Sequence, residues 1–200
     1  MNNYYKIYPQ FSNFAKEISE INLYNSNDYK HTGREHHYDQ LRLSLKFFEG
    51  ETKEQIDKIV KKHFKFDNFL FSIIETETVS QIHTDVNPKK PAAFQRYCNL
   101  AFPIEGILDG RKTFWPKLDE EDFRHCFKNN YVDDNSLPKY LNTENWNDFV
   151  DHKLYQPVLL NTGVPHAALG QHKTLFAYIT LINKSYKDCV ELYDNIASCL

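Results

Sequence analysis

The sequence predicts a mainly β domain, a sandwich or barrel with helices packed outside it. Short segments rich in β-branched and aromatic residues, separated by turn residues, recur from about residue 66 onward. Apolar residues make up 41% of the chain and aromatic residues 15%, so a sizeable core can form although the average residue is polar. The length of 200 residues suits one domain, and no Gly/Ser/Pro-rich stretch or long charge run divides it. We therefore expect a single domain over residues 1–200.

Residues 1–65 are predicted to hold two helices with a strand between them. The first helix covers residues 12–24, where apolar side chains recur at helical spacing after Ser12. Residues 41–47 alternate between apolar and polar, which is typical of a half-buried strand. Thr52 is expected to cap the second helix, with Gln55 completing a capping box. Its packed face is the stripe Ile56, Ile59, Val60, His63 and Phe64.

The barrel itself is expected over residues 66–185. Its predicted strands are 69–74, 78–82, 97–103, 112–115, 154–160 and 174–182. Trp115 is expected in the core or at its rim rather than in a catalytic role. Residues 117–151 break this rhythm as a long polar insertion, which indicates either a functional lid or a mobile loop. We favour a lid on the substrate side, because the insertion lies between the two halves of the motif described below.

Charge and cysteine content count against several classes of function. A net charge of −3 gives no electrostatic footprint of a nucleic-acid or anionic-membrane binder. No run approaches the roughly 18–20 apolar residues that span a bilayer, so we expect a cytoplasmic protein without membrane contact. The four cysteines show no C-x-x-C pair, which favours reduced thiols over a structural zinc site.

Two segments about eighty residues apart carry the candidate chemistry, His83-Thr84-Asp85 and a second one that ends at His166. Residues i and i+2 of a strand share a face, so His83 and Asp85 can reach one cation from one side. His166 follows a Gly-x-Pro turn and would lie at the start of a neighbouring strand. Two imidazoles and one carboxylate form the facial triad that leaves three positions open on non-haem Fe(II), although they also suit catalytic zinc.

These residues resemble the pattern of the Fe(II)/2-oxoglutarate-dependent oxygenases. The resemblance rests on residues 83–85, on residues 164–166 and on a basic residue shortly afterwards, Lys173. Within that superfamily the chain looks most like the aspartyl/asparaginyl β-hydroxylase-like branch and small prokaryotic or phage hydroxylases. The segments behind this likeness are 95–106, which contains Arg96, and 159–166. The chain departs from the usual pattern by having Lys173 where Arg is more common.

The resemblance implies a double-stranded β-helix, the jelly-roll or cupin-like barrel, and a hydroxylase reaction. His83, Asp85 and His166 would bind Fe(II), while 2-oxoglutarate and O2 would occupy the open positions and ascorbate would support turnover. Asp85 favours hydroxylation over halogenation, because the related halogenases lack this carboxylate. Either Lys173 or Arg96 can anchor the distal carboxylate of 2-oxoglutarate, the first as a point charge and the second as a bidentate fork. Asn99, Tyr97 and Thr180 can line the barrel.

The substrate class stays open at this level. The first hypothesis is hydroxylation of an unactivated C–H bond in a small molecule or amino acid, with release of succinate and CO2. A second keeps this chemistry but acts on a protein, peptide or nucleic-acid residue, and the acidic charge balance counts against nucleic acid. A third is a non-catalytic barrel that binds a metal or ligand, because such barrels host many functions.

Overall fold

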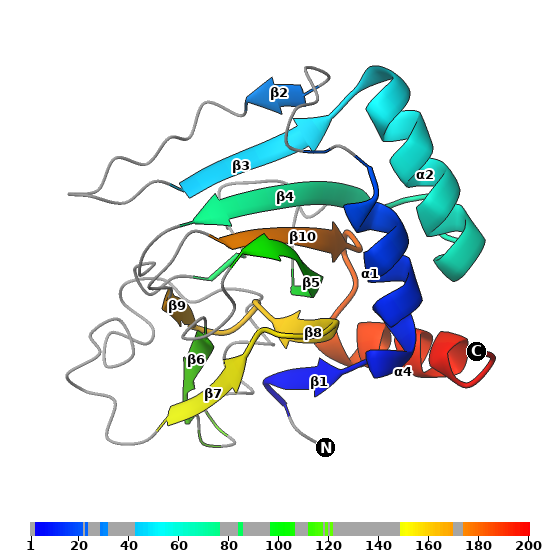
Figure 1. The fold of residues 1–200 in the computed structure, drawn as a ribbon. Helices are drawn as coiled ribbons and strands as arrows, with labels where there is room; N and C mark the ends of the chain where they lie inside the picture. Colours follow the sequence, from blue (N-terminus) through cyan, green and yellow to red (C-terminus); the bar gives the residue numbers. More distant parts are fainter. Residues whose placement is uncertain are drawn as a thin grey trace.

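Two antiparallel sheets and three α-helices make up the described part of the chain (Figure 1). The computed structural model describes residues 3–21, 23, 29–31, 43–76, 84–85, 97–106, 112–117, 119, 121, 149–169 and 174–200. The larger sheet has the strand order β1 (Tyr5–Ile7), β8 (Val158–Asn161), β5 (Cys98–Gly106), β10 (Thr174–Thr180), β4 (Leu70–Thr76), β3 (Leu43–Phe48) and β2 (Tyr29–His31). The smaller sheet has the order β7 (Phe149–Lys153), β6 (Lys112–Pro116) and β9 (Ala167–Leu169).

The two sheets enclose one of two apolar cores, which we call the inner core. Its buried residues come from both sheets and from the loops that join them: Ala101, Trp115, Leu154, Val158, Leu160, Val164, Phe176 and Tyr178. Tyr4, Tyr5 and Ile7, from β1 and the residue before it, pack against these residues. Because β8 leads through a short turn into β9, the chain passes here from the larger sheet to the smaller one.

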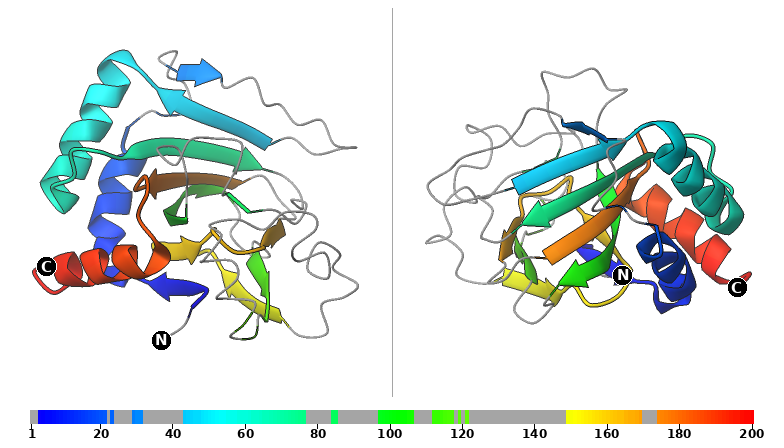
Figure 2. Two further views of the ribbon diagram at one scale, coloured as in Figure 1. Left: turned by 180° about the vertical axis from the view of Figure 1, so that it is seen from behind. Right: turned by 45° about the horizontal axis from the view of Figure 1, so that its top comes forward.

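The outer core lies between the larger sheet and the helices. Alternation along β5 decides which side chains belong to it: Cys98, Leu100 and Phe102 join the outer core, whereas Ala101 joins the inner one. The helices are α1 (Ser12–Ser19), preceded by the 3-10 turn η1 (Pro9–Phe11), α2 (Gly50–Phe64) and α4 (Tyr186–Ala197). Figure 2 shows them together on one side of the larger sheet, away from β6, β7 and β9. The predicted mainly β class with helices outside is therefore confirmed.

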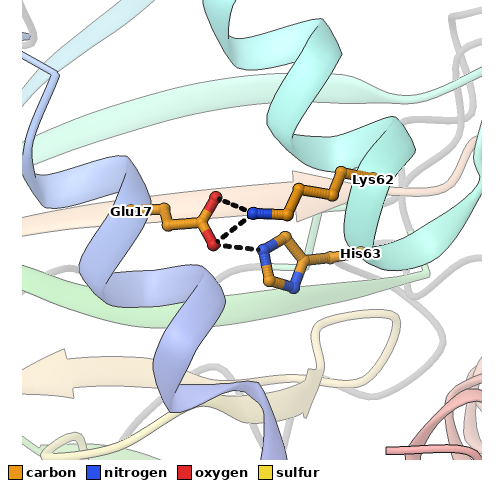
Figure 3. Close-up of polar contacts among 3 residues, drawn as sticks. All are labelled: Glu17, Lys62 and His63. Carbon is orange, nitrogen blue, oxygen red and sulfur yellow. Dashed lines mark hydrogen bonds and ion pairs between the residues drawn. The ribbon is translucent and has the colours of Figure 1, made fainter.

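A polar contact links α1 to α2 beside the outer core (Figure 3). The Lys62 ammonium lies 2.8 Å from Glu17 Oε1, and His63 Nε2 lies 2.9 Å from the same oxygen. These groups lower the pKa of Glu17, with the Lys62 hydrogen bond as the larger cause. The side chain of His63 is only 14% exposed, in agreement with its predicted place on the packed face of the helix.

The start of α2 differs from the sequence prediction. The helix begins at Gly50 after Glu49, so Thr52 is buried inside the first turn rather than capping it. Gln55 contacts Glu51 at 3.3 Å instead of reaching back toward Thr52. The predicted capping box was wrong, because the helix begins two residues earlier and Thr52 therefore lies within its first turn, where it cannot act as the N-cap.

Other boundaries also differ. The first helix ends at Ser19 rather than at residue 24, and the strand predicted over 154–160 begins only at Val158. The last residues of the predicted insertion, 149–151, belong instead to strand β7 (Phe149–Lys153), which pairs with β6. The predicted strand at 78–82 and the insertion between residues 122 and 148 lie outside the described residues. None of the helices described is long and apolar enough to cross a membrane.

Candidate functional site

Asp85 lies against the turn between β8 and β9. Its backbone N–H donates to the carbonyl of Thr162 at 2.9 Å. The backbone N–H groups of Thr162 and Gly163 both donate to the carbonyl of Tyr97, at 3.1 and 2.9 Å, just before β5 begins. Three segments that are distant in sequence thus meet through backbone hydrogen bonds. The structure brings the Asp85 end of the first motif beside the second motif.

Gly163 allows this close approach. A Cβ atom at this position would lie 3.2 Å from the Tyr97 carbonyl oxygen and 3.5 Å from Asn161 Oδ1. The first of these distances is shorter than ordinary van der Waals contact, and it involves backbone that cannot rotate away. A side chain here would therefore push the β8–β9 turn away from β5.

Asn161 fixes the beginning of the same turn. It is fully buried, and its carbonyl accepts a 2.8 Å hydrogen bond from Nε1 of Trp115 in the smaller sheet. Its backbone N–H donates to the Tyr4 carbonyl and its side-chain amide to the Asn3 carbonyl, both at 2.8 Å. The turn is held by both sheets and by the N-terminal segment. Trp115 is a core residue, as predicted.

Asn99 joins the side chains around Asp85. Its Nδ2 lies 2.8 Å from Asp85 Oδ2 and 3.3 Å from Thr162 Oγ1. Its Oδ1 accepts a short hydrogen bond from the hydroxyl of Thr180, in β10. Only 6% of Asn99 is exposed, so this amide is satisfied inside the protein rather than by bulk water.

His166 is buried immediately before β9, at the strand start that the sequence predicts. Its Nδ1 lies 3.0 Å from the carbonyl oxygen of Val164. A carbonyl can only accept, so in this contact Nδ1 carries a hydrogen, and in a neutral ring the lone pair would then lie on Nε2. Metal-binding histidines use this arrangement, in which a fixed N–H on one nitrogen orients the other nitrogen toward the ion.

The remaining predicted site residues divide into two groups. His83, Arg96 and Lys173 lie outside the described residues, so their roles stay predictions. Tyr97 is half-buried, burial raises the pKa of its hydroxyl, and its carbonyl supports the turn at residues 162–163. Within the described residues, no cluster of three His, Cys, Asp or Glu side chains forms a metal site, and this part of the chain contains two of the three predicted ligands.

Sequence reasoning missed His152, a buried histidine in β7. Its ring stacks on Tyr5 with centroids 4.2 Å apart, and its buried Nε2 has no hydrogen-bond partner among the residues that the structure describes. Burial lowers its pKa, while the nearby charge of Asp151 opposes this effect more weakly. The residue went unnoticed because it lies between the predicted polar insertion, which ends at residue 151, and the predicted strand, which begins at residue 154.

Comparisons with known proteins support the fold. No family model matches the chain, and no curated protein matches it significantly. Among solved structures, it is similar to a prolyl-4-hydroxylase of Pseudomonas putida, with a TM-score of 0.52 and 10% sequence identity. The match covers 90% of this chain and 93% of that protein. At this identity the likeness is one of fold, and it confirms the predicted jelly-roll class.

Proposed function

We propose that this chain is an Fe(II)- and 2-oxoglutarate-dependent dioxygenase that hydroxylates a small molecule or an amino acid. The observation that carries the proposal is the hydrogen bond from Asp85 to Thr162, which joins the His-x-Asp segment to the segment that ends at His166. Two residues that the sequence pairs as metal ligands thus come from adjoining segments. The fold it shares with a bacterial prolyl-4-hydroxylase supports the same reading.

The donor set fits ferrous iron. His83, Asp85 and His166 would hold the ion, with two imidazoles and one carboxylate and no thiolate. When bound, iron with 2-oxoglutarate and O2 supplies the oxidising power, and succinate and CO2 are the co-products. The chain's own part is to orient its ligands: the Val164 carbonyl contacts Nδ1 of His166, and Asn99 contacts the carboxylate of Asp85.

The surroundings of these ligands favour a water-poor site. Asn161, Thr162 and Val164 of the β8–β9 turn are almost fully buried, and the inner core lies directly beside it. Excluding water strengthens electrostatic interactions within a site and protects reactive species from side reactions. For the distal carboxylate of 2-oxoglutarate we propose Lys173 or Arg96 as the anchor, since a buried carboxylate needs a cationic partner.

Iron-reconstituted full-length chain, incubated with 2-oxoglutarate and ascorbate, tests the proposal through succinate formation. We expect His83→Ala, Asp85→Ala and His166→Ala each to abolish iron-dependent succinate formation. His63→Ala is the matched control, because His63 lies on α2 among helix contacts. The proposal fails if the wild-type chain neither binds 2-oxoglutarate nor decarboxylates it with any substrate, or if His83→Ala retains full iron binding and turnover.

The anchor is tested separately. We expect Lys173→Ala or Arg96→Ala to raise the apparent KM for 2-oxoglutarate, because removing the cation leaves the distal carboxylate without its partner. Unchanged KM values in both variants would exclude the two assignments while leaving the iron site intact.

A peptidyl target is the alternative that one observation favours, because the structural neighbour is a prolyl-4-hydroxylase. The substrate panel should therefore pair free amino acids with peptides that contain the same residues. Stimulation of succinate release by peptides alone would move the proposal to a protein substrate. Binding of iron and 2-oxoglutarate without any succinate would instead indicate a non-catalytic barrel. Membership of the aspartyl/asparaginyl β-hydroxylase-like branch stays a prediction.

A further inference from the structure

Asn99 places a buried amide side chain on strand β5 of the jelly roll. Asparagine is uncommon within strands. Asn99 lies on β5 opposite Leu160 of β8, whose side chain belongs to the inner core. A buried amide is costly unless its donors and its acceptor are all satisfied. Each of these groups has a partner here, and the partners come from three separate parts of the chain.

The chemistry of the partners fixes the direction of the amide. An ionised carboxylate can only accept, so the NH2 edge of Asn99 must face Asp85. The opposite edge, Oδ1, then needs a donor, and the hydroxyl of Thr180 supplies it. The second Nδ2 hydrogen points to Thr162 Oγ1, on the residue whose carbonyl also holds the backbone of Asp85. A directed chain of hydrogen bonds therefore runs from Thr180 through Asn99 to Asp85.

This chain constrains Asp85 at two points. The backbone is held by the bond from its N–H to Thr162, and the carboxylate is held at Oδ2 by Asn99. If only the backbone of Asp85 were held, its carboxylate could still rotate about the side-chain bonds. The hydrogen bond from Asn99 selects one orientation of the carboxylate plane. Metal ligands that are oriented in this way owe much of their affinity to the outer partner.

We infer that Asn99, itself fixed by Thr180, is the positioning residue that sets the orientation of the Asp85 carboxylate for metal binding. This inference rests on the proposed function, since it takes Asp85 as a ligand. Asn99 acts through Asp85 and does not itself touch the ion. The amide is required for this role: an aspartate would bring a second carboxylate against Asp85, and an alanine would remove the hydrogen bond that Asn99 donates to Asp85 Oδ2.

Binding of Co(II) to the metal-free, full-length chain tests the inference without any turnover. Visible absorption of bound Co(II) reports both the affinity and the ligand geometry, and no co-substrate is added. We expect Asn99→Ala and Asn99→Asp to weaken Co(II) binding by about 10- to 100-fold and to alter the absorption bands. Cys98→Ala is the matched control, because Cys98 precedes Asn99 on the same strand but lies in the outer core.

Thr180 provides a second pair of variants that keeps the test independent of folding. Thr180→Val preserves shape but removes the hydroxyl that fixes Oδ1 of Asn99, whereas Thr180→Ser retains it. We expect weaker Co(II) binding in Thr180→Val and affinity close to wild type in Thr180→Ser. Thermal unfolding of each metal-free variant identifies any that is not folded, and the serine and valine pair then decides the result.

The outcomes separate this inference from the proposed function. If Asp85→Ala loses Co(II) while Asn99→Ala and Thr180→Val bind it as tightly as Cys98→Ala, the positioning role is wrong and the metal site stands. If Asp85→Ala binds Co(II) like the wild-type chain, the proposed metal site fails and the role of Asn99 fails with it. Loss of affinity in Asn99→Ala and Thr180→Val, with recovery in Thr180→Ser, supports the inference.

Discussion

Replacing Trp115 with phenylalanine tests how firmly the β8–β9 turn is held. Trp115 lies on β6 with none of its surface exposed, and its Nε1 donates to the carbonyl of Asn161 at 2.8 Å. The ring stacks on Tyr5 with centroids 5.9 Å apart. Phenylalanine keeps an aromatic ring in the inner core but cannot donate this hydrogen bond. The substitution therefore removes a link between the smaller sheet and the residue that precedes Thr162.

Two contributions set the expected size of the effect. Removing the donor from a buried carbonyl costs about 1–3 kcal/mol. The void left by the smaller ring adds about 1 kcal/mol, since the surrounding core collapses only in part. We therefore expect Trp115→Phe to lower the free energy of unfolding by about 2–4 kcal/mol, against a total of about 5–15 kcal/mol for a typical domain. The variant should remain folded at room temperature but be clearly less stable.

Urea denaturation followed by far-ultraviolet circular dichroism measures this loss without relying on tryptophan fluorescence. Phe149→Leu is the control, because Phe149 is 49% exposed and its replacement should change stability by no more than about 0.5 kcal/mol. Benzothienylalanine at position 115 keeps the shape of tryptophan without its N–H, so it isolates the hydrogen-bond contribution. A loss below about 1 kcal/mol in Trp115→Phe would refute the view that this bond helps hold the turn.

Three further predictions follow from single residues. Because burial lowers the pKa of His152, the unfolded chain takes up a proton first, so the free energy of unfolding should fall as pH drops below about 6.5; an identical pH profile in His152→Phe would contradict this. Gly163→Ala should destabilise the fold by about 1 kcal/mol, from overpacking against Tyr97 that is partly offset by lower chain entropy, and a stabilised variant in thermal melts would contradict the close approach. Glu17→Gln should lower the free energy of unfolding by less than about 1 kcal/mol at neutral pH. Because the pKa of Glu17 is lowered in the folded chain, the wild-type protein should lose stability as pH falls below about 4.5, and the variant should lose less; salt should weaken this difference. Equal loss of stability in acid for both proteins would contradict the ion pair's contribution.

Strands that pair on both sides were predictable from local pattern. The central residues of β4, β5 and β10 include the β-branched and aromatic side chains typical of buried strands. The bounds of these strands lie within a few residues of the predicted ranges. Strand β1 was missed because its three residues show no pattern of their own and depend on pairing with β8. Strand β7 was missed for a similar reason, since its polar residues are stabilised by pairing with β6.

Helix ends were less predictable than helix existence. The start of α2 was placed at Thr52, but the chain begins the helix at Gly50 and buries Thr52 instead. Helix α4 was missed although its start carries a readable signal. Ser185 and Asp188 form a capping box, with the Ser185 hydroxyl accepting from the Asp188 backbone and the Asp188 carboxylate accepting from the Ser185 backbone. The three-residue spacing of these two side chains could have identified it.

Some features of the candidate site follow from local sequence, whereas others depend on contacts between distant residues. The spacing of His83, Asp85 and His166 suggested a metal site from sequence alone, because ligand types and strand periodicity are local properties. The contacts of Asn99 were beyond such reasoning, since its partners Asp85, Thr162 and Thr180 lie 14, 63 and 81 residues away. The pairing of β5 with β8 and β10 brings Thr162 and Thr180 to Asn99, and the hydrogen bond from Asp85 to Thr162 brings Asp85 there.

The role proposed for Asn99 therefore depends on strand register. Asn99 pairs with Leu160 on the inner face, while Cys98 and Leu100 on either side of it belong to the outer core. A slip of one residue in β5 would reverse every side chain on the strand and turn Asn99 toward the helices, away from Asp85. The hydrogen bonds from Thr162 and Gly163 to Tyr97 oppose such a slip, because they tie the start of β5 to the β8–β9 turn. The contacts that hold this turn thus also hold Asn99 in the position from which it can orient Asp85.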